Sequence, residues 1–151
     1  MSYKTLILGF SGVRHLAPVQ VEQVKHDLIQ LSQQKAHWHV GDATGVDALV
    51  RLIAQQQQQN LTVYEAETRE PWQLQRRSKQ MIDAIAISGG TLHAWVNKPC
   101  PVGLTLTSWQ GSGTWGTVRY AHSKEVTIVL HWLCNDPVMP EWMTQEQLRL
   151  F

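Results

Sequence analysis

The sequence is poor in the features that mark secreted and membrane-spanning proteins. It has 2 cysteines in 151 residues, too few for a disulfide framework or a cysteine-based zinc site. Its longest apolar runs, residues 5–10 and 126–133, are far shorter than the roughly 20 residues that cross a bilayer. No charged segment followed by a long apolar stretch opens the chain, so no secretory signal is recognised. We therefore expect a cytoplasmic protein with reduced thiols and no membrane partner.

An excess of charge of one sign is also missing. Lys and Arg total 13 and Asp and Glu total 12, which gives a formal net charge of +1. General nucleic-acid binding needs a large basic surface and is therefore not favoured, although a small cluster of Arg facing a phosphate is compatible with this balance. Hydrophobic residues make up 43% of the chain and charged residues 17%, a composition that excludes a disordered or fibrous protein.

Apolar runs alternate with helical patterns along the whole chain. Strands are predicted over residues 5–9, 37–40, 61–64, 91–96 and 126–130. Helices are predicted to begin near Pro18, Val46, Trp72 and Thr114, and residues 98–113 form a long loop. This alternation indicates βαβ units. We predict one α/β domain over residues 1–151, a three-layer Rossmann-like open parallel sheet of about five strands, with a tail at residues 133–151.

Candidate ligand-binding residues lie at three strand-to-helix junctions, because open parallel sheets bind ligands beyond the carboxyl ends of their strands. Each junction combines glycines, which allow a close backbone approach, with hydroxyls or a cation. The first contains Gly9, Ser11, Gly12 and Arg14, the second Gly41, Thr44, Gly45 and Asp47, and the third Gly111, Ser112, Gly113 and Thr114. Each could be an ordinary turn, but three in corresponding positions favour a shared phosphate site.

Three further side chains are open to two interpretations. Asp47 falls in the first turn of a helix, where a carboxylate interacts favourably with the helix dipole without any ligand. Asp42 either accepts a hydrogen bond from a ribose hydroxyl or caps its turn. Arg77 shares a helix face with Met81, so a buried Met81 would bring Arg77 toward the edge of the sheet. A solvent-exposed basic helix face is the alternative for Arg77.

These segments, in this order, resemble the SLOG superfamily (Smf/DprA–LOG) of Rossmann-like nucleotide-binding domains over roughly residues 6–130. Gly9-Phe-Ser-Gly-Val-Arg14 is similar to the family's first-strand loop. Gly41-Asp-Ala-Thr-Gly-Val-Asp47 is similar to the Gly-x-Ala-x-Gly-x-Asp loop of DprA-type DNA-processing proteins. Arg77-Ser-Lys-Gln-Met81 resembles the Arg-x-x-x-Met helix of LOG proteins, and Gly111-Ser-Gly-Thr114 resembles the core of their Gly-x-Gly-Thr motif.

The resemblance implies a nucleotide or nucleotide-derived, phosphate-bearing ligand at these loops. In LOG enzymes a motif Arg and Glu cleave the base from nucleoside 5′-monophosphates. Arg77 matches that Arg, but the chain reads Trp-Gly-Thr after Thr114, so the motif Glu is missing. Molybdenum-cofactor carrier proteins share the resemblance, which makes a molybdopterin-like ligand an alternative. No cofactor is required, and a homo-oligomer is expected by analogy.

Three functional hypotheses follow. The leading one is nucleotide binding, with the phosphate against Gly111–Thr114, completed by Ser11, Arg14 and Arg77. In it, Thr44, Gly45 and Asp47 contact the sugar. The second is an N-glycosidic phosphoribohydrolase in which Asp47 or Asp42 replaces the missing carboxylate, with Arg77 and Asp47 as its catalytic candidates. The third is a DprA-like DNA-processing module, with nucleic acid as the partner.

Other conspicuous residues receive no catalytic or metal-binding role. His37 and His39 share one face of a strand, but no third ligand is identifiable, so no metal site is predicted. Cys100 lies between two prolines without a neighbouring base, so we do not regard it as a nucleophile. Trp109 and Trp115, in and beside the glycine-rich segment, either stack on a base or belong to the core or a lid.

Overall fold

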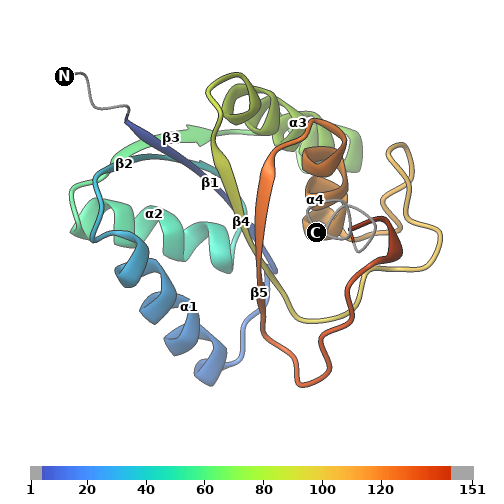
Figure 1. Cartoon of the computed structure of the whole chain (residues 1–151), viewed down its shortest axis with the longest axis horizontal. Helices are drawn as coiled ribbons and strands as arrows, with labels where there is room; N and C mark the ends of the chain where they lie inside the picture. Colours follow the sequence, from blue (N-terminus) through green and yellow to red (C-terminus); the bar gives the residue numbers. More distant parts are fainter. Residues whose placement is uncertain (1–4, 144–151) are drawn as a thin grey trace, which may run out of the picture.

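A five-stranded parallel sheet lies between two layers of helices (Figure 1) in the computed structural model, which describes residues 5–143. The predicted α/β Rossmann-like fold is confirmed. The strands have the order β3-β2-β1-β4-β5 and are β1 (Leu6–Gly12), β2 (Ala36–Gly41), β3 (Asn60–Tyr64), β4 (Thr91–Val96) and β5 (Thr127–Trp132). The helices are α1 (Pro18–Leu31), α2 (Val46–Gln56), α3 (Pro71–Ile87) and α4 (Gly113–Ser123). The predicted tail lies partly outside the described residues.

The strand order places β1 at the centre and reverses the direction of winding there. β1 pairs in parallel with both β2 and β4, while β3 and β5 form the two edges. Helices α1 and α2 cover one face, and α3 and α4 cover the other (Figure 1). Ligands of such sheets bind at the carboxyl ends of the strands beside this reversal. The fold therefore directs attention to the ends of β1, β2 and β4.

The sheet is buried on both faces, which explains the continuous apolar runs of its strands. Leu8, Phe10, Trp38 and Val40 pack with α1 and α2, whereas Leu92, Ala94 and Val96 pack with α3 and α4. Two polar contacts join side chains of the central part of the sheet to their neighbours. His93 Nδ1 lies 2.9 Å from His131 Nε2, and Trp95 Nε1 donates to Asp27 at 3.0 Å.

The boundaries of β1 differ from the prediction because of pairing that sequence patterns do not show. We predicted that β1 ends at Gly9, but Ser11 and Gly12 pair with Ala94 and Trp95 of β4. The Val13 N–H continues this contact by donating to Trp95 O at 3.3 Å. Backbone pairing with β4 thus extends β1 through Ser11 and Gly12, although the sequence of this segment is typical of a turn. β4 was predicted with the correct bounds.

The long segment after β4 is fastened to α4 by two tryptophans. Trp109 is 4% exposed, and its ring lies against Gly116. Trp115 is 1% exposed, and its Nε1 donates to Lys98 O at 2.9 Å. These contacts give the loop a defined position beside the carboxyl end of the sheet. In residues 5–143, no helix has both the length and the apolar character needed to cross a bilayer.

Replacing Gly116 by Ala should destabilise the protein, because the new Cβ would lie 1.9 Å from Trp109 Cδ2. Overpacking of this kind costs about 1–3 kcal/mol, which outweighs the roughly 1 kcal/mol that Ala gains over Gly in a helix. Gly113→Ala is the matched control in α4, since a Cβ added there would meet no atom within 4 Å. Urea denaturation should show a loss for Gly116→Ala and none for Gly113→Ala. Equal stabilities would contradict the packing account.

Candidate functional site

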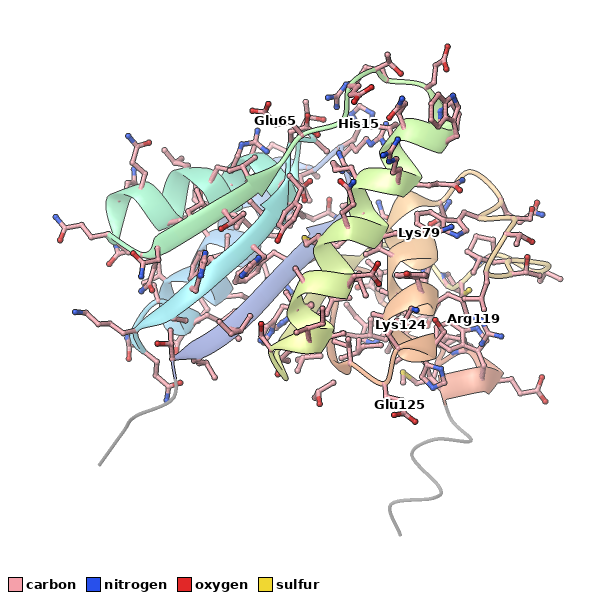
Figure 2. The ribbon with its side chains drawn as sticks, turned by 90° about the horizontal axis from the view of Figure 1, so that it is seen from above. His15, Glu65, Lys79, Arg119, Lys124 and Glu125 are labelled. Atoms are coloured by element: carbon pink, nitrogen blue, oxygen red, sulfur yellow. The ribbon has the colours of Figure 1, made fainter. Side chains whose placement is uncertain are left out.

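A cleft of about 840 Å³ lies at the carboxyl end of the sheet. It is lined by the β1–α1 junction, the first turns of α2, α3 and α4, and the segment after β4. Figure 2 shows His15, from the β1–α1 junction, at this end of the sheet beside the first turns of α3. The predicted site residues that line the cleft are Ser11, Gly12, Arg14, Asp47, Arg77, Gly111, Ser112, Gly113 and Thr114. The three junctions therefore meet in one place.

The first two junctions touch each other, and two of their glycines serve that contact. Gly45 has φ +68°, and a Cβ there would lie 2.3 Å from Val13 O. The Val46 N–H donates to the same carbonyl at 3.0 Å, while a Cβ on Gly12 would lie 2.5 Å from the Val46 side chain. Gly45 lies outside the cleft lining. Its role in the structure is to let α2 begin directly against the β1–α1 junction.

Gly9, Gly41 and Thr44 also lie outside the lining of this cleft. Gly9 is inside β1, where a Cβ would approach Ile85 Cδ1 to 2.7 Å, so this glycine allows α3 to lie close to the sheet. The Thr44 hydroxyl donates to Arg14 O at 3.3 Å and thereby fixes the backbone that carries Arg14. Gly41 faces a smaller cavity beneath the cleft. These positions support the site instead of facing a ligand in the cleft.

Arg77 is a buried cation held by Asp42. Met81, one turn later, is 3% exposed, and Arg77 itself is 8% exposed. Arg77 Nη1 donates to Asp42 Oδ1 at 2.7 Å, and Nη2 donates to Ser78 Oγ at 3.3 Å. Asp42 also accepts from Arg69 and from the Ala66 N–H. These donors lie outside the turn of Asp42, so among the described residues it does not cap that turn. It also lies outside the cleft lining, and its contact with a ribose hydroxyl stays a prediction.

The two acidic residues of the second junction have opposite electrostatics. Partial burial disfavours ionisation of Asp42, but hydrogen bonds from Arg69, Arg77 and Ala66 N outweigh it and lower the pKa to about 2. Asp47 is 5% exposed and accepts one hydrogen bond, from Ala43 N at 3.2 Å. Its burial raises the pKa to about 6, against the opposing effects of Arg77, Ala43 N and Arg51. Asp47 is thus a carboxyl that titrates near neutrality in the floor of the cleft.

The first turn of α4 presents unpaired donors to the cleft. Ser112 caps the helix and accepts from Trp115 N at 3.3 Å. The N–H groups of Gly113 and Thr114 lie in the first turn, where the helix offers them no carbonyl acceptor, so they are suited to bind an anion. Gly111 has φ +73°, a conformation that glycine adopts without strain, and it turns the chain into the helix.

The cleft lining carries an excess of positive charge. Its cationic side chains are Arg14, Arg69, Arg77 and Lys98, and Asp47 is the one carboxylate among the described residues that line it. Asp42, just outside, neutralises Arg69 and Arg77 in part. Within residues 5–143, Arg14 and Lys98 have no ion pair with a carboxylate. The cleft lining is therefore positively charged although the net charge of the whole chain is only +1.

Sequence reasoning missed part of this lining. Asn97 and Lys98 follow β4 directly, and Arg69 precedes α3, so the rule that drew attention to the other junctions applies to them as well. Thr107–Gln110 also line the cleft, and of these only Trp109 was singled out from the sequence, as a residue that either stacks on a base or belongs to the core or a lid. Of the two interpretations offered for Trp115, the core role holds. It packs with Trp132 and Trp142, at ring-centroid separations of 5.8 and 6.5 Å.

The conspicuous histidines lie in the sheet away from the cleft. The rings of His37 and His39 are 4.3 Å apart on one face, as predicted, and bind Thr62 and Tyr64. Burial, with a smaller effect of His37, lowers the pKa of His39 to about 4. In the part of the chain that the structure describes, no three His, Cys, Asp or Glu side chains cluster as a metal site would require. Cys100 is half-buried, and burial raises its thiol pKa.

Comparison with known proteins identifies solved structures that have a similar fold. No family model matches the chain. No curated protein matches it either. Among solved structures, DNA processing protein A (DprA) from Streptococcus pneumoniae aligns with a TM-score of 0.63 at 11% identity, over 97% of this chain and 56% of that one. DprA from Helicobacter pylori, described as binding single-stranded DNA, aligns with a TM-score of 0.58 at 14% identity, over 97% of this chain and 73% of that one.

The fold is DprA-like. This similarity agrees with the DprA part of the resemblance seen in the sequence, and at such low identity it concerns the fold alone. The likeness to LOG proteins stays a prediction. The chain spans just over half the length of the S. pneumoniae protein, so the DprA-like unit is only part of that larger molecule.

Replacing Asp47 by Asn should change the pH dependence of stability. The folded-state pKa of about 6 exceeds the ordinary 3.8, so the folded protein keeps a proton that the unfolded chain releases between these values. The wild type therefore loses stability as the pH rises through this window, and the Asn variant lacks this loss. We expect urea denaturation at pH 4.5 and 7.5 to give different free energies of unfolding for the two proteins. Relative to the wild type, the Asn variant should be about 2 kcal/mol more stable at pH 7.5 than it is at pH 4.5.

A constant difference between the two proteins across this range would contradict the assignment. Asp42 does not interfere, because its pKa of about 2 places its own titration below the window, and both proteins retain it.

Proposed function

We propose that the cleft binds a phosphate-bearing nucleotide or nucleotide-derived ligand. The observation that carries this proposal is the meeting of three strand-to-helix junctions around one cleft. Its described lining includes cations without a carboxylate partner in residues 5–143 and the first N–H groups of a helix. The volume of about 840 Å³ is within the range of roughly 300–1,000 Å³ usual for small-molecule sites and leaves room for a nucleotide.

The phosphate would bind against the first turn of α4. The N–H groups of Gly113 and Thr114 can donate hydrogen bonds to an anion there, and the positive end of the helix dipole adds to their attraction. Arg14 and Lys98 lie in the same lining and lack carboxylate partners among residues 5–143. A guanidinium suits a phosphate because it donates two parallel hydrogen bonds. These groups together would neutralise the charge of a phosphate monoester.

The sugar or an equivalent part of the ligand would face the other side of the cleft. Ser11, Asp47 and Arg77 form that side, at the ends of β1 and β2. A molybdopterin-like molecule also carries a phosphate and stays an alternative within the same proposal. The hydrolase hypothesis depends on Asp47, since it is the one carboxylate in the described lining and its pKa of about 6 suits proton transfer near neutrality.

Single-stranded DNA is the second candidate ligand. It is favoured by the fold similarity to a DprA that is described as binding single-stranded DNA. The same cations and helix terminus would then hold one backbone phosphate. Against an extended DNA site stands the net charge of +1, because each further phosphate contact needs another Lys or Arg.

Arg14→Ala should weaken the binding of nucleoside 5′-monophosphates about tenfold, the usual effect of losing one charge-assisted hydrogen bond. Arg76→Ala is the matched control, since Arg76 is an exposed cation of α3 that does not line the cleft. Calorimetry at fixed ionic strength should leave its dissociation constant within about twofold of wild type. If the two variants lose affinity equally, or if no phosphate-bearing ligand binds the wild type, the proposal fails.

A salt series separates the two candidate ligands. If the cleft holds a single phosphate, a 5′-phosphorylated deoxyoligonucleotide should bind no more than about ten times more tightly than the mononucleotide. The slope of log affinity against log salt should then correspond to about one or two phosphates. Fluorescence anisotropy with the mononucleotide as competitor measures both quantities. A slope equivalent to four or more phosphates would instead support DprA-like DNA binding.

A further inference from the structure

A small inner pocket lies beneath the floor of the cleft. Its volume is about 10 Å³, which matches one water-sized group. Ser11, Asp47, Arg77 and Ser78 line both this pocket and the cleft, so the pocket lies directly under the ligand space. Gly41 forms part of its wall.

Two buried polar groups at this pocket have unused hydrogen-bonding capacity. Arg77 is 8% exposed, and its Nε has no hydrogen-bond partner among the described residues. Asp47 is 5% exposed and accepts a single hydrogen bond in the same part of the chain, from Ala43 N. A carboxylate can accept several. Buried donors without partners are rare and costly in native proteins, so the Arg77 Nε–H calls for an acceptor.

The two groups converge on the same space. A Cβ on Gly41 would lie 2.8 Å from Asp47 Oδ2 and 3.0 Å from Arg77 Nε. Both atoms therefore lie beside Gly41, and both residues line the inner pocket with it. A side chain at position 41 would crowd the two groups.

The chemistry of this pair selects one kind of group. Asp47, when ionised, needs a donor, and the Arg77 Nε–H needs an acceptor. A phosphate oxygen only accepts and an ammonium only donates, whereas a hydroxyl does both. The volume admits one oxygen and excludes a phosphate or a base. The hydrogen-bonding needs of the two side chains and the volume of the pocket therefore both favour a hydroxyl group.

We propose that the inner pocket binds one hydroxyl group of the ligand and so makes the site selective for ribose-type phosphates over their deoxy counterparts. This inference rests on the proposed function, because it assumes that a phosphate-bearing ligand occupies the cleft above. Asp47 and Arg77 are then residues that determine specificity. Gly41, which lines the inner pocket and not the cleft, leaves room there for the hydroxyl because it has no side chain.

The test compares ribonucleoside 5′-monophosphates of all four bases with their 2′-deoxy and 3′-deoxy counterparts by calorimetry. For the base that binds most tightly, removal of one of the two hydroxyls should weaken binding at least about tenfold. Gly41→Ala, whose new Cβ narrows the inner pocket, and Asp47→Ala, which removes the acceptor, should reduce this ratio to about threefold or less. The reduction should come from weaker binding of the probe that carries the hydroxyl.

Asp83→Ala serves as the control carboxylate variant. Asp83 is an exposed residue of α3 that accepts from the Tyr120 hydroxyl and lies outside both cavities, so the variant should keep the full ratio. Should Gly41→Ala fail to fold, the Asp47→Ala protein provides the same comparison.

Three results would overturn the inference. Equal affinities of the wild type for ribose and deoxyribose probes would mean that the pocket holds only a water, and the proposed function would stand. A ratio that persists in both variants would place the discrimination elsewhere in the cleft. Absence of binding by every phosphate-bearing probe would overturn the proposed function, and this inference with it.

Discussion

The carboxyl end of the sheet is organised around one buried cation, the guanidinium of Arg77. A lone buried charge costs several kcal/mol, so the position of Arg77 depends on its ion pair with Asp42 at 2.7 Å. That pair ties α3 to the β2–α2 junction, and Asp42 extends the connection to Arg69 and to the backbone at Ala66. The floor of the cleft, including the space between Arg77 and Asp47, follows from this arrangement. A cation fixed inside the protein is available to a ligand without further ordering.

Glycines in this region have two different roles. Gly9, Gly12 and Gly45 allow backbones and side chains to pack closely, because a Cβ at any of them would meet another atom at 2.3–2.7 Å. Gly111 and Gly113 have no atom within 4 Å of a Cβ position and border open space at the start of α4. A glycine-rich junction therefore does not by itself identify a ligand contact. The distinction depends on whether another part of the protein or solvent lies beside the glycine.

The similarity to DprA concerns the fold, whereas the proposed ligand rests on the residues that line the cleft. The fold places the cleft at the reversal of strand order, as in other open parallel sheets. Within residues 5–143, the lining combines the first N–H groups of α4, Arg14 and Lys98 without ion pairs, and one carboxyl whose pKa burial raises to about 6. Asp47 is the one acidic group in the described lining.

The sequence by itself determined the class of fold, the number and order of the elements, and the segments that end at the ligand-binding edge. Periodicity and apolar runs are local properties, so β4 could be placed residue for residue and α2 from its first residue. Only the tertiary structure decided the extension of β1 and the roles of Asp42, Thr44 and Trp115. These depend on partners far along the chain, such as Arg69 and Arg77 for Asp42 and Arg14 for Thr44. Burial and the inner pocket are likewise properties of the packed molecule, since they arise where β1, β2, α2 and α3 meet.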